Sequence, residues 1–154
     1  MANGDRLDDP EVVVRRFDPT DERHWSVDEA GLPPRLRSSA FRFDREDDDD
    51  PHVGCSVFQE SKLQSVGLTT WGCIEPEREH FRIATANAGR IRALARPGAA
   101  LTTSPFDVIE DALETDYARD AAHALIVHPA SLSGASKWYR GLAGAFEPSL
   151  NPEP

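Results

Sequence analysis

Residues 122–128 have the sequence AHALIVH, and this stretch decides the fold class. Residues 124–127 are all apolar, so a strand here is apolar on both faces, which is typical of a strand inside a sheet. After Pro129, apolar residues recur every three or four positions, which predicts a helix with one core-facing stripe. The residues of this stripe are Leu132, Ala135, Tyr139, Leu142 and Phe146. We therefore expect a central strand followed by a helix that packs on its sheet.

Short strand and helix patterns occupy the rest of the chain. Further strands are predicted at residues 11–17, 35–43, 53–58, 80–85 and 99–103, with another β-prone stretch at 68–74. Further helices are predicted at residues 59–66, after Asn87, and from Ser104, where Ser-Pro-Phe-Asp is typical of a helix start. This order predicts an α+β fold with one mixed, mainly antiparallel sheet of about six strands, and three or four helices. The C-terminal helix is expected to pack on that sheet.

The 154 residues correspond to one domain. We expect residues 11–146 to form it as a single α+β unit. Residues 1–10 and 147–154 are expected to be flexible tails, because both segments are polar and contain proline.

The chain is acidic, with a formal net charge of −10 and a pI of about 4.9. Such a charge repels phosphate groups, so we expect no nucleic-acid and no membrane partner, whereas a basic protein is a suitable partner. The N-terminus lacks the apolar core of a signal peptide, and no apolar run approaches the roughly 20 residues that cross a bilayer. We therefore expect a cytoplasmic protein in which Cys55 and Cys73 are free thiols. Arginine supplies 15 of the 17 basic residues, which is typical of a GC-rich prokaryotic genome.

Motifs for cofactors and metals are absent from the sequence. There is no phosphate-binding glycine loop, no dinucleotide fingerprint and no nucleophile-elbow pattern, so we expect no cofactor. The acidic stretch 44–50 lacks the glycine and glutamate of a calcium loop, and is interpreted as a solvated loop. His123 and His128 are spaced to point in different directions. We therefore expect no metal site.

Arg37 and Ser39 lie in the predicted strand 35–43. If Phe41 and Phe43 face the core, strand alternation turns Ser39 and Arg37 to the same side. A buried guanidinium needs an anionic partner, because an unpaired buried charge is very costly. That partner is either a protein carboxylate or a bound phosphate or carboxylate, and the sequence leaves both open.

His123 is the candidate general acid–base, because it begins the apolar strand and is expected beside a loop. A structural role with satisfied hydrogen bonds is its alternative. Thr85 and Asn87 lie at a predicted strand-to-helix turn, whose free amides suit an anion. Helix capping alone also explains these two residues.

Two functions of different classes remain open. The first is a small acidic binding or regulatory module that docks on a protein partner, such as a toxin-neutralising or operon accessory protein. The second is a small enzyme or ligand-binding protein for a phosphate- or nucleotide-bearing substrate. Its pocket is expected to hold Arg37, Ser39 and His123, with Ser39 and His123 as catalytic candidates and Arg37, Thr85 and Asn87 as ligand-binding candidates.

Overall fold

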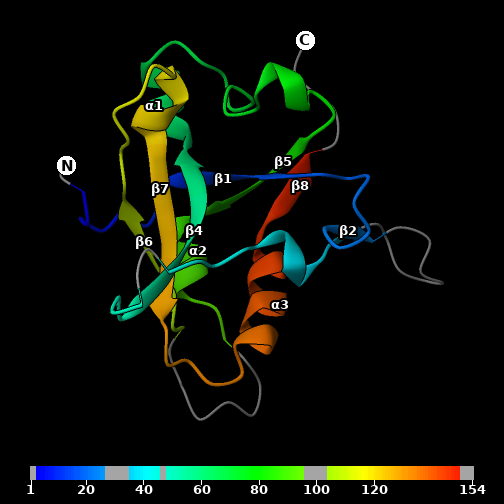
Figure 1. Cartoon of the computed structure of the whole chain (residues 1–154), viewed down its shortest axis with the longest axis vertical. Helices are drawn as coiled ribbons and strands as arrows, with labels where there is room; N and C mark the ends of the chain where they lie inside the picture. The colour runs from blue at the N-terminus through cyan, green and yellow to red at the C-terminus, as the bar shows by residue number, and fades with distance from the viewer. Residues whose placement is uncertain (1–2, 27–34, 46–47, 96–103, 150–154) are drawn as a thin grey trace.

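A computed structural model describes residues 3–26, 35–45, 48–95 and 104–149. Its main feature is a six-stranded sheet in the order β6-β7-β4-β1-β5-β8, in which every pairing is antiparallel (Figure 1). Its strands are β1 (Val12–Phe17), β4 (His52–Gln59), β5 (Arg82–Asn87), β6 (Asp107–Glu110), β7 (His123–Pro129) and β8 (Glu147–Ser149). A second, two-stranded sheet pairs β2 (Trp25–Ser26) with β3 (Arg35–Leu36). The predicted α+β class with a mainly antiparallel sheet is confirmed.

The C-terminal helix packs on the sheet, as predicted. The α-helices of the described residues are α1 (Glu60–Ser65), α2 (Ala88–Arg92) and α3 (Ala135–Ala145). Short 3₁₀ turns are η1 (Ser38–Ala40), η2 (Pro76–Arg78) and η3 (Ala118–Ala122). Helix α3 begins at Ala135 instead of at Pro129, because Gly134 has a left-handed backbone with φ of 68° and separates the helix from the preceding turn.

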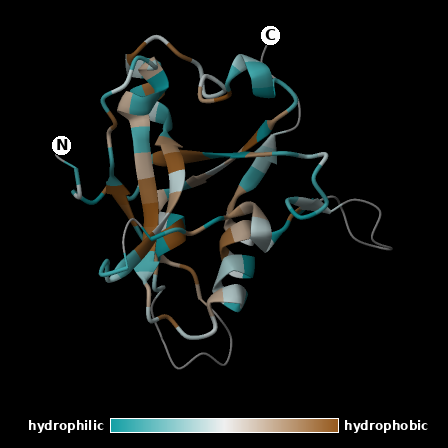
Figure 2. Ribbon diagram, in the orientation of Figure 1, coloured by the Kyte–Doolittle hydropathy of each residue, from teal (hydrophilic) through white to brown (hydrophobic). Residues whose placement is uncertain are grey.

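The main core lies between one face of the sheet and the helices α2 and α3. Strand alternation turns Cys55 and Val57 of β4, and Ala124 and Ile126 of β7, toward this core, and all four are fully buried. Helix α3 contributes Trp138, Leu142, Ala143 and, just beyond its end, Phe146. Figure 2 shows the hydrophobic residues concentrated along β4, β6 and β7.

The opposite face of the sheet is covered only in part. A smaller buried cluster joins Val14 of β1 and Phe58 of β4 to Leu63 of α1 and Ala122 of η3. Beyond this cluster the outward residues of β4, β6 and β7 are half-buried, as at Ser56 and Leu125. This uncovered part of the face is where the candidate site lies.

The predicted strand 35–43 is wrong in most of its length. Strand β3 ends at Leu36, and the chain then makes the 3₁₀ turn η1, after which Phe41 packs against Phe146 with ring centroids 4.9 Å apart. The turn breaks strand alternation, so Phe41 is buried while Arg37 is exposed. The expectation of an inward-facing Arg37 is therefore wrong.

Two other local predictions are corrected by long-range pairing. Residues 107–110 form strand β6 instead of the first turn of a helix, because they pair with β7 and bury Val108. Residues 68–74 form turns. The predicted strand 99–103 lies outside the described residues.

Described residues within both expected tails, 3–10 and 147–149, contact the sheet. Leu7 is 2% exposed and belongs to the main core, and its main-chain N–H donates to the carbonyl of Val108. Residues 147–149 form β8, which pairs with β5. The reason is the same at both ends: an edge of the sheet offers main-chain partners that the sequence pattern does not reveal.

An aromatic cluster joins the C-terminal end of β7 to α3. The ring of Phe43 stacks on Tyr139 at 4.7 Å and packs against His128 at 4.8 Å. His128 donates from Nδ1 to the Pro129 carbonyl at 2.8 Å and accepts at Nε2 from the Tyr139 hydroxyl at 2.7 Å. Both nitrogens are satisfied in the neutral imidazole, and burial lowers the pKa of His128 below its ordinary value.

Leu142→Ala should destabilise the protein by about 2–5 kcal/mol, because it removes a fully buried side chain and leaves a cavity. The measurement is the free energy of unfolding in urea. Gly141→Ala is the matched control, since a Cβ at Gly141 meets no atom within 4 Å. The control should be neutral or stabilise α3 by up to about 1 kcal/mol. A small loss in Leu142→Ala would show that α3 is peripheral.

Protonation of His128 should weaken the fold as pH falls. The folded protein binds this proton at lower pH than the unfolded chain, so the stability due to neutral His128 is complete above about pH 6.5 and is lost below it. Urea unfolding between about pH 8 and 5 should therefore give a shallower pH dependence in His128→Gln than in the wild type. Identical slopes in the two proteins would contradict this assignment.

Candidate functional site

A hollow of about 1120 Å³ lies on the uncovered face of the sheet. Its floor is formed by β4, β7 and β6, and residues 3–6 and 42–45 contribute to its walls. Three polar side chains meet in it, one from each of the floor strands or their ends: Ser56, His123 and Asp111. They come together because β7 lies between β4 and β6 in the sheet.

His123 is hydrogen-bonded on both sides. Its Nδ1 lies 2.9 Å from Asp111 Oδ2 and 3.1 Å from the Asp111 main-chain carbonyl, and its Nε2 lies 3.0 Å from Ser56 Oγ. Both partners of Nδ1 are acceptors, so Nδ1 carries the hydrogen. Nε2 then accepts from the hydroxyl of Ser56. This is the arrangement of a serine nucleophile, a general base and an orienting carboxylate.

The sheet register produces this line of residues. Phe58 is directly opposite His123 in the β4–β7 pairing, so Ser56 is the diagonal neighbour of His123 on the same face. Asp111 follows β6, and its main-chain N–H donates to the His123 carbonyl at 3.1 Å. That bond extends the β6–β7 pairing by one residue and places Asp111 beside the imidazole.

Neighbouring groups fix the positions of His123 and Asp111. The edge of the Phe58 ring meets the imidazole at a centroid distance of 5.6 Å and an interplanar angle of 82°. Glu110, next to Asp111, is buried, accepts from Gln59 Nε2 at 2.8 Å and forms an ion pair with Lys62. These contacts attach the end of β6 to the start of α1.

Arg15 places a positive charge beside Ser56. Strands β1 and β4 pair at Val14 and Phe58, and Arg15 is the next residue of β1. It donates to the Ser56 carbonyl at 2.8 Å from Nη1 and to the Ala40 carbonyl at 2.9 Å from Nη2. Among the described residues no carboxylate pairs with Arg15, so its charge is balanced only by carbonyl dipoles.

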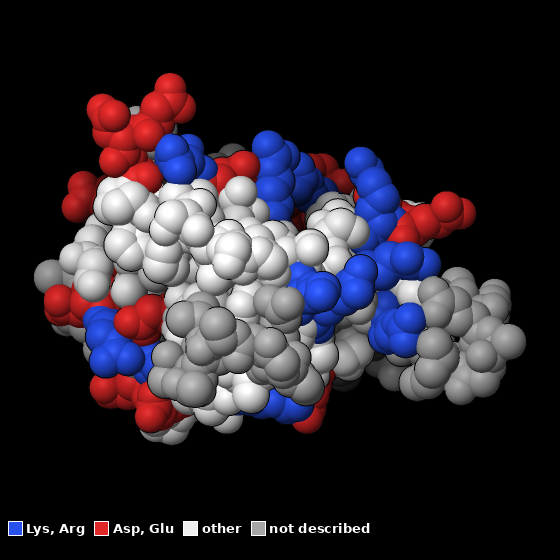
Figure 3. Space-filling model, turned by 90° about the horizontal axis from the view of Figure 1, so that it is seen from below, with Lys and Arg blue, Asp and Glu red and all other residues white. Residues whose placement is uncertain are grey.

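The predicted residues Arg37 and Ser39 line a second hollow, of about 660 Å³, between η1 and the end of α3. Arg35 and Arg140 also line it (basic side chains are blue in Figure 3). Ser39 is exposed, and its hydroxyl is hydrogen-bonded to the Arg23 carbonyl. Among the described residues no histidine is hydrogen-bonded to this hydroxyl.

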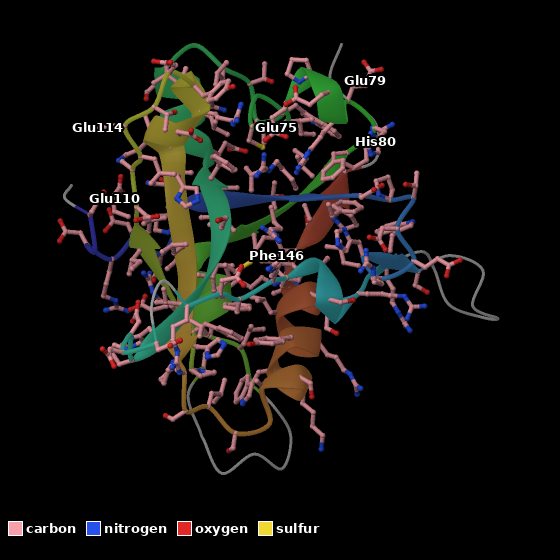
Figure 4. All side chains as sticks on the ribbon, viewed as in Figure 1. Glu75, Glu79, His80, Glu110, Glu114 and Phe146 are labelled. Atoms are coloured by element: carbon pink, nitrogen blue, oxygen red, sulfur yellow. The ribbon has the colours of Figure 1, made fainter. Side chains whose placement is uncertain are left out.

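The structure therefore does not bring Arg37, Ser39 and His123 into one pocket. His123 lines the first hollow, while Arg37 and Ser39 line the second. Figure 4 labels one residue of each: Glu110 at β6 on the left, and Phe146 at the end of α3 in the centre.

Thr85 and Asn87 lie in β5 and are not among the lining residues of either hollow. Asn87 caps α2, because its side-chain oxygen accepts from the Arg90 main-chain N–H at 2.8 Å. Thr85 is paired with Val14 on one side and Glu147 on the other. Capping and strand pairing account for both residues.

Ser56 and Asp111 were not identified from the sequence. They lie 67 and 12 positions from His123, so no local spacing joins them. One feature of the sequence could have identified Ser56: it is the polar residue between Cys55 and Val57, so it faces away from the core. Nothing in the sequence around Asp111 distinguishes it from the other acidic residues that follow it.

The two cysteines are poor candidates for a nucleophile or a metal ligand. Both are buried, and burial raises the pKa of Cys55 and raises that of Cys73 to about 11. Within the described ranges no group of three or more His, Cys, Asp or Glu residues is arranged to hold a metal ion. None of the helices in those ranges has the length and apolarity to cross a membrane.

Comparison with known proteins finds no matching family model, no matching curated protein and no matching solved structure. The chemical interpretation of the site rests on its geometry.

Neutral His123 should carry its hydrogen on Nδ1, because both groups facing that nitrogen are acceptors. Long-range ¹H–¹⁵N NMR on ¹⁵N-labelled protein distinguishes the two tautomers by their nitrogen shifts. Ser56→Ala should shift the Nε2 resonance and leave the Nδ1-protonated tautomer dominant. A dominant Nε2-protonated form would show that Ser56 does not donate to this histidine.

Proposed function

We propose that the chain is a small hydrolase or acyltransferase in which Ser56 is the nucleophile. The observation that carries the proposal is the hydrogen-bonded series Ser56–His123–Asp111 at 3.0 and 2.9 Å on the floor of an open hollow. A histidine with only a structural role also needs both nitrogens satisfied. A catalytic role is favoured because the serine and the carboxylate of this series both line the hollow, where a substrate has access.

The proposed reaction follows from the tautomer of His123. Ser56 Oγ attacks the carbonyl carbon of an ester, and Nε2 takes the hydroxyl proton. Asp111 stabilises the imidazolium through Nδ1–H. The imidazolium then gives its proton to the leaving alcohol, and water cleaves the acyl-serine with His123 again acting as the base.

Arg15 is proposed to stabilise the negative charge that develops when Ser56 attacks the carbonyl carbon. Its guanidinium is bonded to the main-chain carbonyl of Ser56 itself, so positive charge lies next to the nucleophile. It uses Nε, Nη1 and Nη2 for its bonds to Ala40 and Ser56, and a guanidinium has five N–H groups in all. Two N–H groups of Arg15 are thus not used by these three bonds.

The test is covalent labelling with a fluorophosphonate, which reacts with activated serines. Mass spectrometry of the wild type should find one adduct, on Ser56. His123→Gln should lower the labelling rate by about 100-fold or more, because the general base is lost. Ser39→Ala is the control: it removes a hydroxyl in the second hollow and should leave the rate unchanged.

Absence of an adduct, or an adduct whose rate does not depend on His123, would refute the proposed function. Circular dichroism of each variant separates loss of activation from loss of folding. Asp111→Asn adds a second check, since it keeps the size of the side chain and removes its charge.

Docking on a protein partner is the alternative proposal, and the net charge of −10 supports a basic partner for it. Docking needs no activated serine, so the labelling experiment distinguishes the two. For either function we propose a cytoplasmic location without nucleic-acid or membrane partners. The acidity and the two free cysteines support this location.

A further inference from the structure

The second hollow has a charge opposite to that of the whole chain. Three arginines line it, Arg35, Arg37 and Arg140, and none of its described lining residues is acidic. The chain as a whole carries a formal charge of −10. In Figure 3 the basic side chains gather over the same region, toward α3 and the small sheet.

Arg140 lines the hollow from α3. It is exposed on α3, and no described carboxylate forms an ion pair with it. Glu147, the next acidic residue after Arg140 in the sequence, is paired with Arg90 at 3.7 Å. Arg35 and Arg37 have other contacts, yet a guanidinium with five N–H groups can hold a structural partner and a ligand together.

The remaining lining residues suit an organic group. Leu36, Ala143, Phe146 and Pro148 supply apolar surface, and the hollow of about 660 Å³ is within the usual size of a small-ligand site. Ser38 adds a hydroxyl at the rim. Cationic side chains beside apolar surface match a ligand that has a charged end and an uncharged body.

We propose that this hollow binds the phosphate group of a small organic phosphate, with Arg140 and Arg37 as its main contacts. Guanidinium groups bind phosphate oxygens in pairs of parallel hydrogen bonds, and several of them together match its double charge. The site is separate from Ser56 and does not depend on the proposed hydrolase function.

The test is thermal unfolding and calorimetric titration of the full chain with pyrophosphate, against sodium chloride at equal ionic strength. The wild type should show saturable stabilisation by pyrophosphate. Arg140→Gln should weaken the apparent affinity about tenfold or more, and Arg140→Lys should restore part of it. Adenosine monophosphate and glucose 6-phosphate, used as separate probes, distinguish a nucleotide from a sugar phosphate as the natural source.

Lys137→Gln is the matched control. Lys137 is exposed one turn before Arg140 on the same helix and does not line the hollow. Its loss should change the affinity less than about twofold, because Lys137 does not line the hollow and its exposed charge acts only through screening solvent. The absence of a saturable effect in the wild type would overturn the proposal. An equal loss of affinity in Arg140→Gln and Lys137→Gln would also overturn it, because it indicates general charge attraction. Ser56→Ala should bind pyrophosphate as the wild type does.

Discussion

The pairing register of β4 with β7 is the constraint on which the rest of the structure depends. It sets Cys55 against Ile126 and Ser56 against Leu125, and thereby assigns each residue of two central strands to a face. A shift of one residue would turn the side chains of one strand to the opposite face, so that either Ser56 or His123 would enter the main core and aliphatic side chains of that strand would leave it. The hydrophobic effect therefore fixes the register, and the register in turn aligns Ser56 with His123, to which the β6–β7 pairing adds Asp111. Core stability and site geometry are consequences of the same pairing.

Elements with an uninterrupted or strictly periodic apolar pattern could be predicted from the sequence. The apolar run of β7 and the stripe of α3 are of this kind, because burial on a large surface determines both. Predictions from local sequence signals were wrong where pairing with a distant strand stabilises a different structure. Ser104 and Pro105 favour a helix start, yet Val108 gains more by pairing next to β7 at the sheet edge. The prediction for Arg37 assumed that strand alternation continues to Phe43. The chain turns at η1 instead, so the predicted inward orientation of Arg37 is wrong.

The candidate site could be predicted only in part, for a topological reason. His123 lies at the start of the most recognisable strand, so its position beside a loop followed from the sequence. Its partners come from the middle of β4 and from the residue after β6, and only the strand order brings them to it. Strand order is not encoded in any local pattern. The single predicted pocket was divided for the same reason, since Arg37 belongs to a segment that packs on α3 and not on β7.

The position of Arg15 has a mechanical consequence. Its guanidinium is bonded to the Ala40 carbonyl at the end of η1 and to the Ser56 carbonyl in β4. Ser38 and Ser39 of η1 line the second hollow, and Ser56 lies on the floor of the first. A displacement of η1 must therefore either pull Arg15 with it or break its bonds to Ala40. One side chain thus ties the turn beside the second hollow to a floor strand of the first, so its truncation would free two segments that lie far apart in the sequence.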